Sequence, residues 1–390
     1  MTQEATDRRF MARAVELARL GWYTTMPNPR VGCVIVDING QVIGEGWHKR
    51  AGEPHAEVHA LRVAGSRAKG ATAYVTLEPC CHFGRTPPCA EALKAAGIAR
   101  VVAALQDANP SVSGKGMAML QKAGIETQSG VLEAEARSLN EGFFKRMSTG
   151  MPLVRAKLAM SLDGRTAMAS GESQWITGPM ARSEVQKLRA QSCAVITGVG
   201  SILKDNSSLT VRPSELNLAN AEEICKRQPL RVVLDSTLKT PVDAKVISGP
   251  GNCLIVTTSR FCSEKKALLE QAGAEVLILD NAEDITDGRV GLPALLAELG
   301  HRKCNEVLLE AGAQLAGSMM TEDLIDLLII FMAPALMGSE AKPLLNLPLD
   351  TMSKKKKVVI KDIRAIGDDW KITARPIPKK IAATSPFRNL

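Results

Sequence analysis

The sequence predicts an α/β protein built from two domains. Its 390 residues exceed what one ordinary core accommodates, since a domain takes roughly 100–200 residues. Hydrophobic residues make up 45% of the chain and charged residues 23%, a balance typical of folded globular proteins. Helix-like and strand-like segments alternate along both halves, and a turn-rich stretch at 149–152 separates them. We therefore expect one domain over 1–149 and another over 150–390.

The first half begins with an amphipathic segment. Apolar residues at helical spacing predict a helix over about 7–20, which Gly21 ends. A strand-like run at 31–36 predicts a strand, and Asn39-Gly40 predicts a hairpin turn into a second strand at 41–44. This order, continued by the later segments, predicts three layers with a sheet between helices. The later segments are helix 55–64, strand 73–77, helix 89–96, strand 101–105, helix 116–123, a short strand and helix 132–147.

The second half alternates in the same way and has no internal repeat. The strand at 306–310 leads into small residues at 311–317, which open a helix. The lysine run 354–357 precedes a final strand pair, so we expect a solvated sheet edge there rather than a nucleic-acid patch. The remaining predicted elements are strands at 153–160, 194–196, 230–234, 253–256 and 276–279 and a helix at 178–191.

Composition and charge narrow the function classes. The net charge of +8 divides equally between the first 150 residues and the remainder, so neither half is a concentrated basic module. Aromatic residues are only 3%, which disfavours a protein that stacks single-stranded nucleic acid. From the charge and the composition we expect a small phosphorylated ligand and no nucleic acid. We also expect no membrane span, because the longest apolar run, 327–337, is shorter than the ~20 residues that a span needs. Nine scattered cysteines and no signal-peptide pattern predict a reducing cytoplasm.

Histidine and cysteine cluster in one short region of the first domain. Four of the five histidines lie between 48 and 82, beside the cysteines at 80, 81 and 89. One histidine and two cysteines suit a catalytic zinc, because they leave the fourth tetrahedral position open for water. We expect His55, Cys80 and Cys89 to be the ligands and Glu57 to be the acid/base that does not bind the metal. This pattern predicts a zinc-dependent deaminase of an amino-heterocycle.

The identity of the third ligand is open at this point, since deaminases of this type usually have only two residues between the cysteines. Cys81 and His82 are alternatives to Cys89. Cys89 is favoured because it follows two prolines at a predicted helix start, where the helix dipole stabilises a thiolate. A structural zinc site or ordinary buried cysteines would leave the neighbouring glutamate without a purpose. His59 and His82 are expected to have structural or substrate-shaping roles.

Several stretches in both halves carry the features of a known family. The first half contains PNPRVGCVIV at 27–36, GEGWH at 44–48, GEPHAEVHAL at 52–61 and an insert at 79–89 that ends in GRTPPC. The second half contains KLAMSLDG at 157–164, GESQWIT at 171–177 and DNSSLTVR at 205–212. Together they resemble the bifunctional riboflavin-biosynthesis deaminase/reductases, over about residues 7–375. The insert separates that family from cytidine and tRNA adenosine deaminases.

The resemblance implies two folds and two consecutive steps. A cytidine-deaminase-like three-layer α/β/α domain would use Zn²⁺ to deaminate a phosphoribosylated diaminopyrimidinone to its uracil form. A dihydrofolate-reductase-like α/β domain would then reduce the ribose to a ribityl chain with NADPH. Asn28 and His48 would line the deaminase pocket. In the reductase domain, the implied substrate-binding residues are Ser173, Arg189, Leu209, Arg212 and Glu310, and the implied NADPH-binding residues are Ala159, Trp175, Ser201, Asp205, Ser236, Gly312, Ala313, Gln314, Leu315, Ala316, Gly317 and Ser318.

Residue chemistry supports part of this interpretation independently. A strand that ends at Glu310, before a small-residue turn and a helix, can bind a pyrophosphate through main-chain N–H groups. The sequence has no G-x-G-x-x-G motif, which argues against a Rossmann domain. Arg189 and Arg212 are candidate phosphate forks. Lys157 and Asp205 are candidate catalytic residues for the reduction.

Two other functions remain compatible with the sequence. One is a nucleic-acid base deaminase with a non-catalytic, nucleotide-binding C-terminal domain. The low aromatic content, the divided charge and the insert between the cysteines argue against it. In the other, the second half serves only regulation or dimerisation. We also expect the protein to form a homo-oligomer.

Overall fold

The computed structural model describes residues 2–81, 88–110, 112–280 and 288–378, and the chain divides into two compact units. The first unit comprises Met1–Pro152 and Gly300–Asn305, and the second comprises Leu153–Leu299 and Glu306–Leu390. The predicted ranges differ from this division, because the structure joins 150–152 and 300–305 to the first unit. Residues 300–305 join the first unit through close backbone contact, since a Cβ on Gly300 would lie 1.8 Å from the Gly150 carbonyl oxygen.

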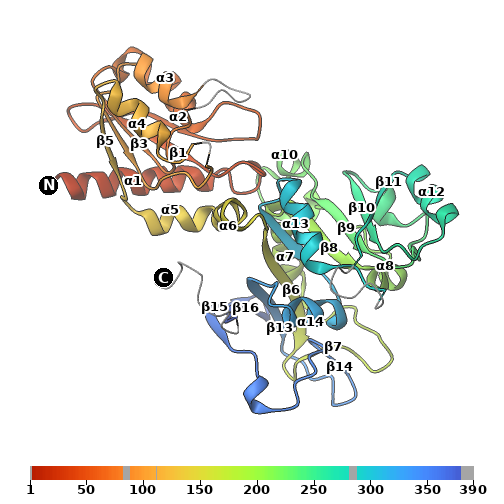
Figure 1. The fold of residues 1–390 in the computed structure, drawn as a ribbon. Coiled ribbons are helices and arrows are strands. Elements are labelled where there is room, and N and C mark those ends of the chain that lie inside the picture. The colour runs from red at the N-terminus through yellow and green to blue at the C-terminus, as the bar shows by residue number, and fades with distance from the viewer. Residues whose placement is uncertain (1, 82–87, 111, 281–287, 379–390) are drawn as a thin grey trace. The chain divides into compact units, whose positions relative to one another are not determined.

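The first unit is a five-stranded sheet between two layers of helices, which confirms the three-layer prediction (Figure 1). Its strands are β1 (Gly32–Val36), β2 (Val42–Trp47), β3 (Thr72–Val75), β4 (Arg100–Ala103) and β5 (Glu126–Ser129), in the order β2-β1-β3-β4-β5. Strand β1 is antiparallel to β2 and β3, and β4 and β5 continue parallel to β3. Helices α1 (Gln3–Arg19), α5 (Glu133–Leu139) and α6 (Glu141–Thr149) cover one face, and α2 (Ala56–Ala64), α3 (Cys89–Ala95) and α4 (Lys115–Lys122) cover the other.

Alternation along β1 explains why the sheet is covered on both faces. All five residues are buried; Val34 and Val36 contribute to the core beneath α1, and Cys33 and Ile35 to the core beneath α2. Strand β2 lets α2 lie directly against it, because a Cβ on Gly46 would be 2.5 Å from the Ala56 carbonyl oxygen. This close approach fixes the helix that begins at the predicted metal site.

The single helix predicted over 132–147 is wrong. The structure has two helices, α5 and α6, which meet at Asn140 with φ −133° and ψ 28°. The Asn140 side chain accepts a hydrogen bond from the Arg30 N–H at 2.8 Å and donates one to the Arg30 carbonyl oxygen at 2.9 Å. This pairing, far along the chain, outweighs the local helical periodicity.

The second unit contains a nine-stranded sheet in the order β11-β10-β9-β8-β12-β6-β13-β16-β15. Strands from β11 to β13 pair in parallel, whereas β16 pairs antiparallel with both β13 and β15. The strands are β6 (Leu153–Ser161), β8 (Ala194–Gly198), β9 (Leu230–Leu234), β10 (Cys253–Thr257), β11 (Ala274–Ile278), β12 (Glu306–Leu309), β13 (Leu327–Ala333), β15 (Val358–Ile366) and β16 (Asp369–Pro376). A separate pair joins β7 (Arg165–Ala167) to β14 (Lys342–Pro343).

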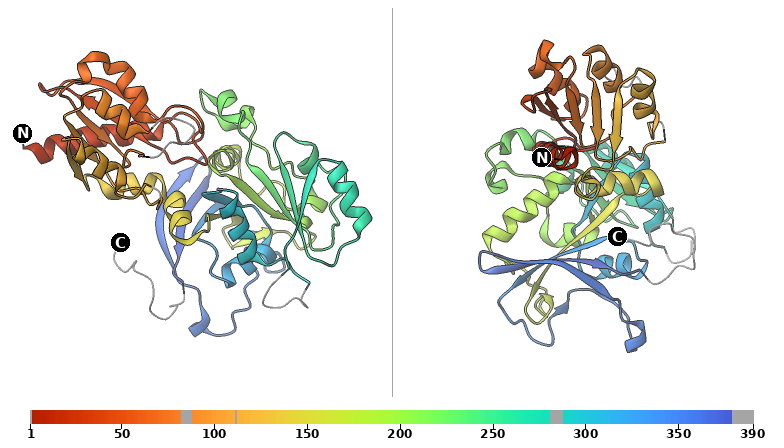
Figure 2. Two further views of the ribbon diagram at one scale, coloured as in Figure 1. Left: turned by 45° about the horizontal axis from the view of Figure 1, so that its top comes forward. Right: turned by 90° about the vertical axis from the view of Figure 1, so that its left-hand side faces the viewer.

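Helices of this unit connect the parallel strands, and the final hairpin stands at the end of the sheet (Figure 2). The helices are α7 (Pro179–Gln191), α8 (Val199–Asp205), α9 (Pro213–Leu216), α10 (Ala221–Cys225), α11 (Lys245–Ser248), α12 (Ser263–Gln271), α13 (Leu292–His301) and α14 (Ala313–Thr321). In the described ranges, short 3₁₀ turns lie at Gly65–Ala68 in the first unit and at Met352–Lys354 in the second. Nowhere in the described ranges is a helix both long and apolar enough for a membrane span.

The lysine run at 354–357 precedes β15, which is the edge strand of the sheet, as predicted. The expectation that the whole run is solvated is wrong for Lys356. Its side chain is only 12% exposed, and its ammonium nitrogen lies 2.6 Å from a carboxylate oxygen of Asp323. This lysine is therefore part of an ion pair beside the hairpin rather than a free surface charge.

Candidate functional site

The three predicted metal ligands converge in the first unit. His55 is the N-cap of α2, Cys89 is the first residue of α3, and Cys80 follows the end of β3. Their ligand atoms lie within 4.8 Å of one another, and His55 Nδ1 is 3.2 Å from Cys89 Sγ and 3.6 Å from Cys80 Sγ. Ligand atoms of a tetrahedral zinc should lie about 3.6 Å apart, given the usual zinc–nitrogen and zinc–sulfur bond lengths. The donor set and its spacing therefore fit a zinc ion with one position left for water.

The structure also bears on the alternative ligands. Among the residues that the structure describes, the cluster contains Cys89 and not Cys81. His82 lies outside the described residues. The N-terminus of α3 holds Cys80, since the Ala90 N–H donates to the Cys80 carbonyl oxygen at 3.1 Å and the Cys89 N–H donates to Cys80 Sγ at 3.3 Å. A hydrogen bond between the thiols lowers the pKa of Cys80 and raises that of Cys89.

Glu57 lies in the first turn of α2, beside the cluster, and is 3% exposed. Burial raises the pKa of its carboxyl group, and the nearby His55 partly opposes this effect. A carboxyl group with a raised pKa holds a proton more readily than a surface glutamate. Such a group suits an acid/base that must both take up and release a proton near neutral pH.

Asn28 and His48 lie beside the cluster, as the resemblance implied. The rings of His48 and His55 meet edge to face, with centroids 5.3 Å apart. His48 Nδ1 is 3.2 Å from the Pro54 carbonyl oxygen, and His48 Nε2 is 3.1 Å from Asn28 Nδ2. Burial lowers the pKa of His48 to about 4, so the ring is neutral, with Nδ1–H donating to Pro54 and Nε2 accepting from Asn28. These two hydrogen bonds of His48 orient the Asn28 amide.

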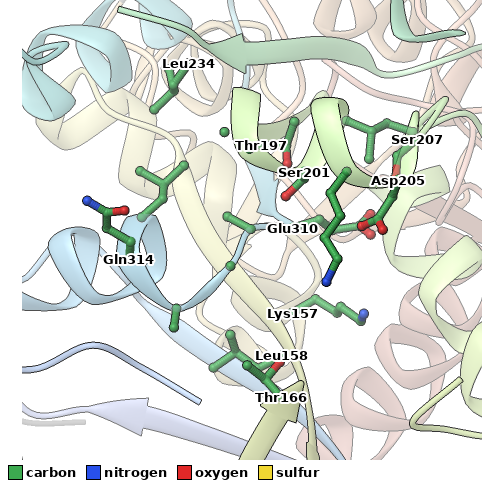
Figure 3. A pocket seen from close by; sticks show the side chains of 18 of the residues that line it. Lys157, Leu158, Thr166, Thr197, Ser201, Asp205, Ser207, Leu234, Glu310 and Gln314 are labelled. Carbon is green, nitrogen blue, oxygen red and sulfur yellow. The ribbon is translucent and has the colours of Figure 1, made fainter. Parts of the chain in front are cut away.

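The second unit contains a cavity of about 1570 Å³ at the carboxyl ends of its parallel strands. In Figure 3, Lys157, Glu310 and Asp205 lie to one side of the view and Gln314 and Leu234 to the other. The candidate catalytic residue Lys157 lines this cavity. So do most of the residues predicted to bind substrate or NADPH: Ala159, Ser173, Trp175, Arg189, Ser201, Asp205, Leu209, Arg212, Ser236, Glu310, Gly312, Ala313, Gln314, Leu315 and Ser318.

Ala316 and Gly317 were predicted with this group, but the structure places them away from the cavity. Both belong to α14 and are buried. A Cβ on Gly317 would lie 2.2 Å from the Asn346 carbonyl oxygen, so this face of the helix packs against backbone. Helical periodicity explains the correction, because only part of α14 can face a cavity on one side of it.

An ion pair with little exposure to solvent lines the cavity. Arg189 donates from Nε and Nη2 to the two carboxylate oxygens of Glu310, at 2.6 and 2.9 Å, and from Nη1 to the Thr210 carbonyl oxygen at 3.1 Å. Burial alone would raise the pKa of Glu310, but Arg189 and Lys157 lower it. Burial lowers the pKa of Lys157. The predicted phosphate fork of Arg189 is thus turned towards Glu310.

Asp205 and Trp175 are more exposed than catalytic or cofactor-enclosing groups usually are. Asp205 is the last residue of α8 and is exposed. Trp175 is 71% exposed, and the Arg182 guanidinium carbon lies 4.6 Å from its ring centroid. Both still line the cavity.

Several residues that line the cavity carry no signal in the sequence. Lys204 and Lys342 come from distant segments, and a Cβ on Gly171 would lie 3.6 Å from the ammonium nitrogen of each. Thr197, at the end of β8, also lines the cavity (Figure 3). No local pattern marks these positions, because a lone lysine or threonine at a strand or loop end is common everywhere.

Comparison with known families agrees with the two sites. The cytidine and deoxycytidylate deaminase zinc-binding region matches residues 4–105, and the RibD C-terminal domain matches 152–372. The riboflavin biosynthesis protein RibD of Escherichia coli is 49% identical over 93% of this chain and 97% of its own length. Its counterpart in Haemophilus influenzae is 48% identical over 95% of this chain and 97% of its own length.

Solved structures show the same fold over almost the whole chain. RibD of Acinetobacter baumannii matches with a TM-score of 0.88 and 44% identity, over 96% of this chain and all of that one. A Thermotoga maritima deaminase/reductase, described as acting on diaminohydroxyphosphoribosylaminopyrimidine and 5-amino-6-(5-phosphoribosylamino)uracil, matches with a TM-score of 0.81 and 31% identity over 96% of this chain.

These matches decide between the functions left open by the sequence. They confirm the deaminase fold of the first domain and the reductase domain of the second, and they do not support a nucleic-acid base deaminase with a non-catalytic second half. A zinc-binding deaminase region and a reductase domain give the chain two cofactors, Zn²⁺ and NADPH. The chain therefore belongs to the RibD family of bifunctional deaminase/reductase enzymes of riboflavin biosynthesis.

Proposed function

We propose that the first unit carries out the deamination and the second unit the reduction. The substrate of the first step would be 2,5-diamino-6-(5-phosphoribosylamino)pyrimidin-4(3H)-one, and that of the second 5-amino-6-(5-phosphoribosylamino)uracil. The observation that carries this assignment is the convergence of one imidazole, two thiols and a buried carboxyl group in the first unit. The large cavity with its buried cation–carboxylate pair lies in the second unit.

In the deamination, His55, Cys80 and Cys89 hold the metal. When bound there, zinc supplies the Lewis acidity that makes a water nucleophilic near neutral pH. Glu57 would accept one proton from the attacking water and deliver it to the ring nitrogen. It would then carry the remaining hydroxyl proton to the amine, which departs as ammonia as the carbonyl forms. Its raised pKa matches this shuttle role. Removal of the carboxyl group should therefore stop proton transfer and leave metal binding intact.

Asn28 orients the pyrimidine in this proposal. Its Nδ2 group is engaged by His48, whereas no group in the described ranges donates to its Oδ1. That oxygen can accept a hydrogen bond from an amino group of the substrate. Because His48 stays neutral, it holds the amide in this one orientation.

The reduction requires a hydride at C1′ of the opened ribose or its imine, which NADPH would supply when bound in the cavity of the second unit. The first N–H groups of α14 face the cavity, and no side chain caps them, because the N-cap residue is Gly312. The space beside Gly312 is open, since a Cβ there would meet nothing within 4 Å. This end of the helix suits the cofactor's pyrophosphate. The contacts that we assign to NADPH are those of the cavity-lining residues Ala159, Trp175, Ser201, Asp205, Ser236, Gly312, Ala313, Gln314, Leu315 and Ser318.

Lys157 is the group that we assign to the reacting carbon. Burial lowers its pKa, which makes its proton easier to transfer, and Glu310 holds a compensating charge nearby. Its ammonium group has no hydrogen-bond partner within the part of the chain that the structure describes, so its donors are available to a ligand. We give Asp205 the lesser role of orienting the ribose from the cavity rim.

The substrate phosphate has a binding site that does not depend on Arg189. The main-chain N–H groups of residues 207–210 donate no hydrogen bond within the described ranges. Leu209 in this stretch (φ +56°) and Asn206 just before it (φ +44°) are left-handed. Successive N–H groups in such a conformation form an anion-binding concavity. Arg212 follows directly and lines the same cavity, as does Ser173. The strain at Leu209 is consistent with a functional position.

We further propose that the protein is a cytoplasmic homo-oligomer whose substrates are small molecules and not nucleic acids. The edge strand β15 supports an association of copies, because Val358, Val359, Ile360 and Ile363 on it are 43–56% exposed. The scarcity of aromatic residues, 3%, argues against binding of single-stranded nucleic acid. Size-exclusion chromatography with light scattering would test the oligomer, and a monomer at micromolar concentration would contradict it.

A pair of variants tests the assignment of the two steps. Glu57→Gln should retain zinc and lose deamination by about 10²–10⁴-fold, while it still oxidises NADPH with the deaminated substrate. Lys157→Met should show the reverse pattern. Normal deamination by Glu57→Gln, or loss of both activities in either folded variant, would contradict the assignment.

A further inference from the structure

Glu78 is a buried carboxylate that the chemistry described above does not use. It lies between β3 and Cys80, and only 3% of the residue is exposed. Within the described residues, no lysine, arginine or histidine side chain forms an ion pair with it, and the partners of its carboxylate are main-chain N–H groups. A buried charge without a cation must be stabilised by hydrogen bonds, so its partners show what it holds.

Four main-chain N–H groups surround this carboxylate. Oε1 accepts from Gly116 at 2.9 Å and from Met117 at 3.2 Å, in the first turn of α4. Oε2 accepts from Gly114, the N-cap of α4, at 2.9 Å and from Asp107 at 3.1 Å. A carboxylate at a helix N-terminus satisfies otherwise unpaired N–H groups and interacts favourably with the helix dipole. Glu78 therefore fastens its own chain segment to α4 and to the loop after β4.

This fastening is transmitted directly to Cys80. A Cβ on Gly116 would lie only 1.9 Å from the Pro79 carbonyl oxygen, so α4 is in backbone contact with the residue between Glu78 and Cys80. The Glu78 N–H also donates to the Leu105 carbonyl oxygen at 3.0 Å. Cys80 is thus anchored to α4 through Glu78 and Pro79, in addition to its hydrogen bonds with the start of α3.

We infer that Glu78 is a positioning residue for the metal site, which sets the position of the Cys80 thiolate by clamping residues 78–80 to α4. The inference rests on the proposed role of Cys80 as a ligand. Groups that orient ligands from outside the coordination sphere typically change metal affinity or activity 10–100-fold when they are replaced. Glutamine has the same shape but presents an NH₂ group in place of one oxygen, so two of the four N–H groups lose their acceptor.

The test uses the full-length chain with Zn²⁺ or Co²⁺ as the probe. Glu78→Gln is compared with Glu133→Gln, which removes a carboxylate of the same unit from a surface pair with Arg137. Glu78→Gln should bind Zn²⁺ about 10–100-fold more weakly in competition with a chelator, and the thiolate and ligand-field bands of its Co²⁺ form should shift at saturating metal. Its deaminase kcat should fall while NADPH oxidation with the deaminated substrate is unchanged. Glu133→Gln should match the wild type throughout.

Unchanged Zn²⁺ affinity and an unchanged Co²⁺ spectrum in Glu78→Gln would overturn the inference even if the variant were less stable, because a purely structural role alters stability alone. If Glu78→Gln does not fold, Gly116→Ala is the second variant. It retains the carboxylate, but its Cβ would lie 1.9 Å from the Pro79 carbonyl oxygen and 3.2 Å from Glu78 Oε1, so residues 78–80 must move away from α4. A folded Gly116→Ala with the wild-type Co²⁺ spectrum would also overturn it. Absence of thiolate bands in the wild-type Co²⁺ protein would instead contradict the metal site itself.

Discussion

Replacing Glu310 with glutamine removes the negative charge that compensates Arg189 and Lys157, two cations with little exposure to solvent. The Arg189 and Glu310 side chains are 12% and 10% exposed, and two hydrogen bonds of 2.6 and 2.9 Å join them. Removing one partner of such a pair leaves an uncompensated buried charge, which costs about 3–5 kcal/mol. Lys157 also loses its compensating charge, which lowers its pKa further. The neutral amine then has no proton to donate, so the reduction should be impaired.

Urea unfolding of the full chain, followed by circular dichroism, would measure this effect on the transition of the second unit. The matched control is Glu270→Gln, which breaks an exposed pair with Lys266 on α12 and should cost less than about 1 kcal/mol. Arg189→Met combined with Glu310→Gln should be less destabilised than Glu310→Gln alone, because the unpaired guanidinium is then absent. A change of less than about 1 kcal/mol in Glu310→Gln would refute the reasoning, since a buried pair cannot be broken so cheaply.

Three further predictions concern other parts of the molecule. Gly46→Ala places a Cβ 2.5 Å from the Ala56 carbonyl oxygen, so α2, which carries Glu57, must shift. Deamination should fall about 10²-fold without loss of reduction. A steady-state deaminase activity equal to that of the wild type would contradict this. Asp7 is paired with Arg100 and has a lowered pKa despite its burial, so its contribution to stability is present above pH 3.8 and is lost as the pH falls below that value. The stability difference between wild type and Asp7→Asn should therefore shrink in acid unfolding titrations, and a difference independent of pH would contradict the pairing. Arg212→Met should raise the KM for the phosphorylated reductase substrate about 10-fold, because one charged hydrogen bond to the phosphate is lost. The change in kcat should be small, because the side chain is half exposed. An unchanged KM would exclude the phosphate role.

The metal cluster could be predicted from the sequence because its residues stand next to local signals. His55 precedes a helix, Cys80 follows a strand, and Cys89 opens another helix, so short-range patterns bring all three to element ends. Glu78 gave no such signal. Its four hydrogen-bond partners lie 29 to 39 residues away, and only the folded chain brings them to it.

Long-range pairing also explains what the sequence analysis missed elsewhere. Arg189 and Glu310 were both predicted to face a ligand, but they are 121 residues apart and their direct pairing could not be inferred. The break between α5 and α6 depends on hydrogen bonds between Asn140 and Arg30, which are 110 residues apart. Periodicity describes which face of an element is buried, but it does not identify the polar group that meets that face.

The central claim is that two different sites act in series on one substrate, the first with zinc and the second with NADPH. The most direct measurement is NADPH oxidation by the full chain, with and without a zinc chelator, on the diaminopyrimidinone phosphate and on its deaminated form. We predict that the chelator abolishes oxidation with the diamino substrate and leaves oxidation with the deaminated substrate unchanged. Chelator-insensitive oxidation with the diamino substrate, or equal inhibition with both substrates, would contradict the account.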